Sequence, residues 1–112
     1  MKFSAIILLL LLASCIKKAD APSADQVTPD QLVARGKSIY ALNCIACHNV
    51  DPKKDGVVGP AVFGSSPELI HARVMKAEYS PGYTPKRATK QMAAITHLEK
   101  ELPALHAFLN AQ

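Results

Sequence analysis

The stretch Cys44-Ile45-Ala46-Cys47-His48 decides how this 112-residue chain is interpreted, because C-x-x-C-H is the attachment sequence for c-type haem. Two thiols at this spacing each add to a vinyl group of one porphyrin, and the adjoining imidazole binds the iron. Cys44, Cys47 and His48 are therefore the first candidate cofactor-binding residues. The expected cofactor is one covalently attached haem c per chain.

A bare C-x-x-C pair leaves two other interpretations open. A thioredoxin-like dithiol usually follows a strand in a βαβ pattern, and a structural zinc site needs a second pair of ligands. Neither companion feature is evident in the sequence. Haem attachment is favoured because it is the one interpretation that uses both cysteines and the histidine.

Length and composition agree with a small domain built around a cofactor. A chain of 112 residues allows one domain with a limited core of its own, and a haem would supply apolar mass. The chain is 49% hydrophobic, but part of that count lies in a single N-terminal run. The average composition therefore overstates the apolar content of the folded part.

Residues 1–14 have the pattern of a secretion signal. Lys2 is followed by nine uninterrupted apolar residues, Ala5–Ala13, a run too short to span a bilayer stably. The run ends in Leu12-Ala13-Ser14-Cys15, which resembles the lipobox of bacterial lipoproteins. Cys15 is thus the expected lipidation site and the first residue of the mature protein. The alternative is an ordinary signal peptide that leaves Cys15 as a loose thiol.

The segment after the lipidation site reads as a tether. Residues 15–27 are rich in Lys, Ala, Asp, Ser and Pro and show no sustained apolar period. The expected organisation is a signal peptide at 1–14, a lipidated cysteine and tether at 15–27, and a folded domain at 28–112. We expect an exported protein anchored on the periplasmic side of a bacterial membrane. Ile16, the residue right after the lipidated cysteine, is not aspartate, and under the sorting rule known for enteric bacteria this favours the outer membrane.

Helix signals divide the folded region into three helices, so the expected fold class is all-α. Thr28-Pro29-Asp30-Gln31 combines an N-cap, a first-turn proline and a capping-box glutamine, and it predicts a helix up to the approach to Cys44. Gly36 inside that helix indicates the close passage of another backbone. Ser66-Pro67-Glu68 predicts a second helix to about Glu78.

The second and last helices have recognisable apolar faces. Ile70, Val74 and Ala77 share one face of the second helix. An irregular loop starts at Tyr79 and continues to Met92. The last helix is expected over about Glu101–Ala111, where Pro103 is tolerated in the first turn. Its expected buried stripe consists of Leu105, Phe108 and Leu109.

With these features in place, residues 28–112, about three quarters of the chain, resemble a small class I cytochrome c. The matching features are Gly36-x-x-Ile39-Tyr40 before the haem motif, the motif itself, Gly59-Pro60 after it, a loop methionine and a terminal helix with an aromatic residue. The resemblance implies three main helices and irregular loops packed around one haem. It also implies that the first and last helices cross at Gly36.

The resemblance also implies an axial ligand set. The family places its axial methionine in the loop before the final helix, which gives His48 and Met92 as the iron ligands. Met75, His71, His97 and His106 are the other candidates for the sixth ligand. Gly59-Pro60 shapes the loop on the proximal side, with the Pro60 carbonyl as the expected acceptor for the His48 ring N–H. A simple turn with no role toward haem is the alternative for that pair.

The expected function is electron transfer rather than catalysis. Histidine and methionine ligation raises the reduction potential and fills both axial positions, so such a site moves single electrons. The expected partners are a redox donor and acceptor, such as a dehydrogenase and a terminal oxidase. The alternative is a haem-based sensor or small peroxidase in which Met92 is displaced by a ligand.

The charge pattern suggests how a partner is approached. Removing Lys2 with the signal reduces the 13 Lys and Arg to 12, against 9 Asp and Glu, a formal charge of +3. Lys86, Arg87 and Lys90 lie near the proposed ligand loop, where they either steer an acidic redox partner or are ordinary solvated charges. An exported chain without an aromatic-interleaved basic surface is not expected to bind nucleic acid.

Overall fold

A computed structural model describes residues 26–111 of the chain. Its elements follow the order α1 (Pro29–Asn43), α2 (Pro67–Lys76), the short 3-10 helix η3 (Thr96–Glu101) and α3 (Leu102–Leu109), and these residues form no strand. The prediction of an all-α fold with three main helices is confirmed. The predicted signal peptide, Cys15 and most of the predicted tether lie outside the described residues.

Helix α1 begins at the predicted capping box. The Thr28 hydroxyl accepts a hydrogen bond from the Gln31 N–H at 3.3 Å, and the Gln31 side chain accepts one from the Thr28 N–H at 2.9 Å. These reciprocal bonds satisfy donors that a helix start leaves free. The helix ends at Asn43, so Cys44 caps it, with its N–H donating to the Tyr40 carbonyl at 2.9 Å.

Helix α2 starts where the sequence indicates but ends earlier. The Ser66 hydroxyl accepts from the Leu69 N–H at 3.2 Å. The helix stops at Lys76 rather than near Glu78, because Ala77 adopts the left-handed conformation with φ of 57°. Ile70 and Val74 are buried, whereas Ala77 is a C-cap rather than part of the helical face.

The last helix differs most from its prediction. The chain enters through η3 and becomes α-helical at Leu102, and α3 ends at Leu109, two residues before the predicted end. The start of η3 has no side-chain cap, so it left no local signal in the sequence. Leu105 and Leu109 are buried as expected, and Ala104 is buried as well, whereas Phe108 is half-buried and packs against the core cluster.

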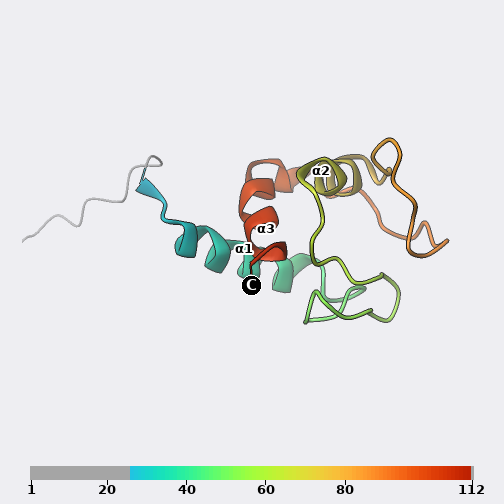
Figure 1. Cartoon of the computed structure of the whole chain (residues 1–112), viewed down its shortest axis with the longest axis horizontal. Helices are drawn as coiled ribbons and strands as arrows, with labels where there is room; N and C mark the ends of the chain where they lie inside the picture. The colour runs from blue at the N-terminus through green and yellow to red at the C-terminus, as the bar shows by residue number, and fades with distance from the viewer. Residues whose placement is uncertain (1–25, 112) are drawn as a thin grey trace, which may run out of the picture.

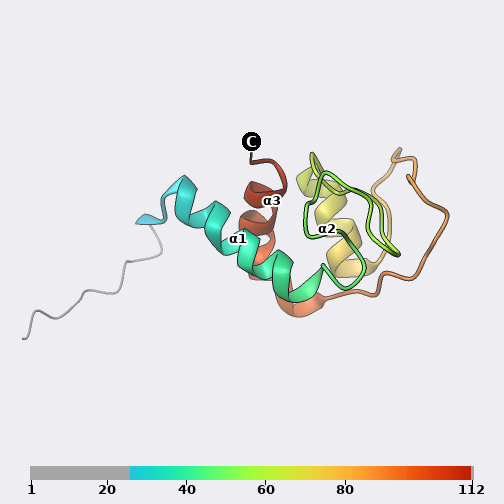
Figure 2. The same ribbon diagram turned by 90° about the horizontal axis from the view of Figure 1, so that it is seen from below.

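The helices pack around a small apolar core. Figures 1 and 2 show α3 crossing α1 on one side, with α2 and the two long loops on the other. The core cluster consists of Tyr40, Ile70, Val74, Leu98, Leu105 and Leu109. Within residues 26–111, no helix has the length and apolar character needed to span a membrane.

An ion pair on the surface ties α1 to the start of α3. Arg35 donates two hydrogen bonds to the Glu101 carboxylate, through Nε at 2.6 Å and Nη2 at 2.5 Å. The two parallel bonds form the fork geometry typical of arginine and carboxylate. The bond from Arg35 holds the pKa of Glu101 below its usual value.

Gly36 lies where α1 and α3 cross. A Cβ on this residue would overlap the carbonyl oxygen of Ala104 and lie 2.8 Å from the Phe108 Cβ. The predicted close approach of another backbone is therefore confirmed, and the approaching segment is α3. A side chain larger than hydrogen would separate the two helices.

Replacing Gly36→Ala is expected to destabilise the protein by about 1–3 kcal/mol, because overpacking outweighs the roughly 1 kcal/mol gain in helix propensity. Lys37→Ala on the exposed side of the same helix is the control and is expected to change stability by less than about 0.5 kcal/mol. Urea unfolding of the holoprotein measures both. Equal stabilities of the two variants would contradict the close crossing.

Candidate functional site

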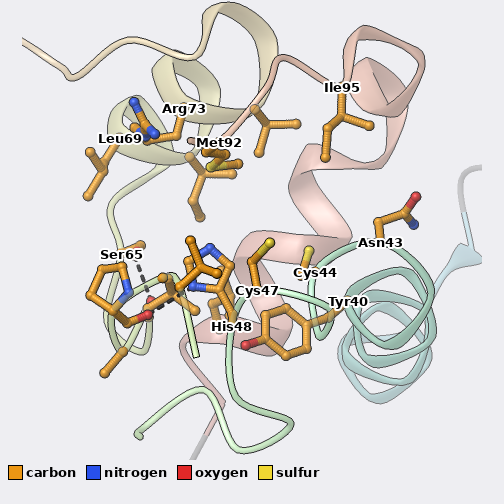
Figure 3. A pocket seen from close by; sticks show the side chains of 18 of the residues that line it. Tyr40, Asn43, Cys44, Cys47, His48, Ser65, Leu69, Arg73, Met92 and Ile95 are labelled. Atoms are coloured by element: carbon orange, nitrogen blue, oxygen red, sulfur yellow. Dashed lines mark hydrogen bonds between the residues drawn. The ribbon is translucent and has the colours of Figure 1, made fainter. Parts of the chain in front are cut away.

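The Cys-x-x-Cys-His motif forms a tight turn directly after α1. The N–H groups of Cys47 and His48 both donate to the Cys44 carbonyl, at 3.1 and 2.9 Å. This turn brings the two thiols and the imidazole to one cavity, whose lining includes all three residues (Figure 3). The turn after α1 thus places the two thiols and the imidazole of the motif together.

The cavity has a volume of about 370 Å³ and lies between the three helices and their loops. Its surface is mostly apolar, and five residues of the core cluster line it: Tyr40, Ile70, Val74, Leu105 and Leu109. Apolar cavities of a few hundred Å³ with a few polar groups are typical of cofactor sites. Two thiols and an imidazole on the wall of such a cavity fit a covalently attached haem.

His48 is held by the loop that follows the motif. Its Nδ1 lies 2.9 Å from the Pro60 carbonyl oxygen. A carbonyl can only accept, so Nδ1 carries the proton and Nε2 keeps its lone pair for a ligand bond. The contact expected between the His48 ring and Pro60 is therefore present in the structure.

Gly59 packs directly under the His48 ring. A Cβ on Gly59 would overlap Cε1 and Nδ1 of the ring and lie 2.9 Å from Nε2. The N–H groups of Val58 and Gly59 both donate to the Cys47 carbonyl, at 3.1 and 2.9 Å. The loop is thus fastened to the motif by backbone bonds and by the absence of a side chain.

Gly56 has a similar role that sequence reasoning missed. A Cβ there would lie 2.6 Å from the Asn49 nitrogen and overlap the Cys47 carbonyl oxygen. The available signal was a second glycine three residues before Gly59-Pro60. Because neither glycine has a side chain, the loop from Gly56 to Pro60 packs closely against the motif.

The alternative interpretations of the cysteine pair fit the structure poorly. Burial raises the pKa of the Cys44 thiol to about 11, whereas attacking thiols in redox dithiols have a lowered pKa. The motif follows a helix rather than a strand. Across residues 26–111, no three His, Cys, Asp or Glu side chains form a group suited to a metal ion, so a closed zinc site lacks its ligands there.

Met92 faces the same cavity from the far side. It lies on the irregular loop between α2 and η3, is half-buried, and packs against the core cluster. Figure 3 shows Met92 across the cavity from Cys47 and His48. The structure therefore brings together all four of these predicted site residues.

The other candidates for the sixth ligand lie elsewhere. Met75, His71, His97 and His106 are absent from the lining of this cavity. Met75 packs against the core from α2. His71 and His106 line a separate groove between α2 and α3, and His97 is exposed on η3.

Several cavity residues gave no signal in the sequence. Arg73 donates through Nη1 to the Ala77 carbonyl at 2.6 Å, and its guanidinium lies 4.2 Å from the centre of the Tyr79 ring. Tyr79 stacks on Tyr83, with ring centres 5.7 Å apart. These three residues add a charged group and two aromatic rings to the lining of the cavity. They come from a helix end and an irregular loop, where side-chain direction has no sequence period.

The three basic residues near Met92 are placed differently from one another. Arg87 is half-buried and lines the cavity, Lys86 donates to the Ala61 carbonyl at 2.9 Å, and Lys90 is exposed. Lys86 and Arg87 are thus engaged within the molecule. Of the three, Lys90 is the residue that fits the predicted steering of a partner.

Comparison with known families agrees with this geometry. Residues 33–112 match the family described as cytochrome c, which covers more than half of the chain. The chain belongs to the cytochrome c family. A search of curated proteins gave no match. Cytochromes c bind covalently attached haem c, so the predicted cofactor is confirmed, and Cys44 and Cys47 are present to attach it.

Membership also supports the broad function. Cytochrome c domains transfer electrons through haem and are typical of electron carriers, although some c-type cytochromes are enzymes. The family match begins at residue 33, inside α1, so the predicted domain boundary at Thr28 stays a prediction. The capping box at Thr28 is compatible with it.

Replacing Gly59→Ala in this cytochrome c is expected to push the His48 ring away from the Pro60 carbonyl, because the added Cβ would overlap the ring. The expected result is a loss of at least about 2 kcal/mol in unfolding free energy and an altered ferric haem spectrum. Val57→Ala, in the same loop but 93% exposed, is the control and should resemble the wild type. An unaltered spectrum in Gly59→Ala would show that the ring is not confined there.

Proposed function

We propose that this cytochrome c is a membrane-tethered carrier of single electrons, with His48 and Met92 as the two axial iron ligands. One observation carries the proposal: a histidine and a methionine face one apolar cavity from opposite sides, beside the two attachment cysteines (Figure 3). Sulfur and imidazole are ligands that low-spin haem iron accepts.

Each residue has a defined task in this proposal. When bound, the haem supplies a one-electron iron couple. Cys44 and Cys47 hold it covalently, and His48 presents Nε2 because Nδ1 is engaged by Pro60. A Met92 thioether favours ferrous over ferric iron and so raises the reduction potential. Filling both axial positions leaves no open site for oxygen or peroxide, which favours a carrier over a sensor or peroxidase.

The ligand assignment is tested by comparing two methionine variants. Holoprotein from the wild type and from Met75→Ala should show low-spin ferric haem with the methionine charge-transfer band. Met92→Ala should lose that band and bind carbon monoxide readily in the ferrous state. Met75 is the matched control, because it packs on the same core outside the cavity.

Two outcomes would overturn the assignment. The first is a band that survives in Met92→Ala and disappears in Met75→Ala. The second is a wild-type protein with high-spin haem and ready carbon monoxide binding, which would favour the sensor or peroxidase instead.

The proposed partners are an exported or membrane-bound donor and acceptor of single electrons, such as a dehydrogenase and a terminal oxidase. The mature formal charge of +3 gives only a weak overall field. Local charge therefore matters more, and exposed Lys90 beside the Met92 loop suits approach by an acidic partner.

The proposed tether rests on the sequence of residues 1–27. Acylation of Cys15 would anchor the domain on the periplasmic side of a membrane, with the outer membrane favoured by Ile16. The wild type is expected to appear in the membrane fraction and to incorporate labelled palmitate, whereas Cys15→Ser should incorporate none, with haem attached to both. Immunoblots of the fractions, haem staining and the label in the purified proteins measure this. A wild-type protein without the label would contradict the lipid anchor.

A further inference from the structure

The loop that carries Met92 is held mainly by side chains. It covers residues 77–95 between α2 and η3, and its outer ends are fixed by backbone bonds such as that from the Ile95 N–H to the Val74 carbonyl at 2.6 Å. Among the described residues, no backbone–backbone hydrogen bond involves residues 84–94. The position of Met92 therefore depends on side-chain contacts of this inner part.

Arg87 makes most of the polar contacts between this inner part and the rest of the molecule. Its Nη1 donates to the carbonyls of Gly56 and Val58, at 3.2 and 3.1 Å, and its Nη2 lies 3.3 Å from the Asp55 carboxylate. Lys86 adds a bond to the Ala61 carbonyl. All four acceptors belong to residues 55–61, the loop that supports His48. The two basic residues thus join the loop of one proposed axial ligand to the loop of the other.

The accepting loop is firm enough to serve as an anchor. Asp55 accepts from the Ala61 N–H at 2.8 Å, and the Gly56 N–H donates to the Gly59 carbonyl at 2.9 Å. Two further backbone bonds fasten it to Cys47. An exposed ion pair contributes little by itself, and the Asp55 side chain is 63% exposed. The Arg87 side chain is only 32% exposed, so its charged bonds to two carbonyls carry more weight.

We propose that Arg87 is a positioning residue that fastens the Met92 loop to residues 55–61 and thereby keeps Met92 at the cavity. The proposal rests on Met92 as the sixth ligand. Arg87 acts through the loop and does not itself touch the iron. Its loss frees the inner loop and lets an added ligand compete with the methionine.

Imidazole binding to the ferric holoprotein tests this. Arg87→Ala is expected to bind imidazole about tenfold more tightly than the wild type, since local opening of the loop becomes easier. Arg87→Lys should resemble Arg87→Ala, because an ammonium keeps the charge but cannot bridge Asp55 and two carbonyls in the same geometry. Lys90→Ala removes a charge from the same loop and should stay within about twofold of the wild type.

Two results of the titration would overturn the proposal. Wild-type imidazole affinity in Arg87→Ala would show that the contacts do not hold the loop. Wild-type affinity in Arg87→Lys would show that charge alone suffices.

Subtilisin cleavage supplies a readout that does not depend on the ligand. This protease does not require Arg or Lys at its cleavage site, so the Arg87 substitution does not itself remove a site. Arg87→Ala should be cut within residues 84–94 about tenfold faster than the wild type, with the thermal unfolding of the helices little changed. Faster cleavage with an equal loss of helix stability would indicate a general structural role and overturn the proposal. If Met92→Ala keeps the methionine band, the ligand assignment fails, yet the cleavage rates still report whether Arg87 fastens the loop.

If Arg87 variants yield no holoprotein, Asp55→Asn weakens the contact between the two loops by changing the partner of Arg87. An asparagine keeps an oxygen for the Ala61 N–H but loses the charge that faces Arg87. The expected change is a rise of about threefold in imidazole affinity and in cleavage rate. Wild-type values for both would count against the fastening role.

Discussion

The apolar cavity between the three helices is the constraint on which the rest of this structure depends. Among residues 26–111 only seven hydrophobic residues are buried, and several of them, such as Tyr40, Ile70 and Leu105, also line the cavity. A domain this small buries a modest share of its surface, so it needs the apolar mass of a cofactor to complete its core. The same apolar side chains therefore stabilise the fold and surround the haem.

The two walls of the cavity are built by different physical means. On the His48 side, backbone bonds to Cys47 and the missing side chain of Gly59 fix the loop closely. On the Met92 side, the loop is long and is held by packing and by side-chain bonds from Lys86 and Arg87. A rigid wall suits the proposed role of His48 as a ligand, which requires a fixed tautomer and ring direction. The looser wall leaves the position of the methionine dependent on a few side-chain contacts.

Local chemistry explains which helix boundaries could be predicted. The starts of α1 and α2 follow from the hydroxyl caps of Thr28 and Ser66, which act within one turn. The end of α2 and the 3-10 helix η3 could not be predicted, since Ala77 in a left-handed conformation and an uncapped 3-10 turn have no such signal, whereas α3 starts within one residue of the predicted position. The burial of Ala104 arises where α3 meets Gly36, a contact between distant segments.

By itself the sequence determined the haem motif, the all-α fold and the closeness of another backbone at Gly36, and its resemblance to cytochromes c gave His48 and Met92 as the expected ligands. These features depend on residues that act within a few positions of one another, or on a glycine that only a close contact explains. Tertiary structure alone decided that Met92 shares the cavity with His48 while Met75 does not, and that Arg87 turns inward to residues 55–61. The physical reason is that an irregular loop has no period to set side-chain direction, so its contacts exist only after distant segments have packed.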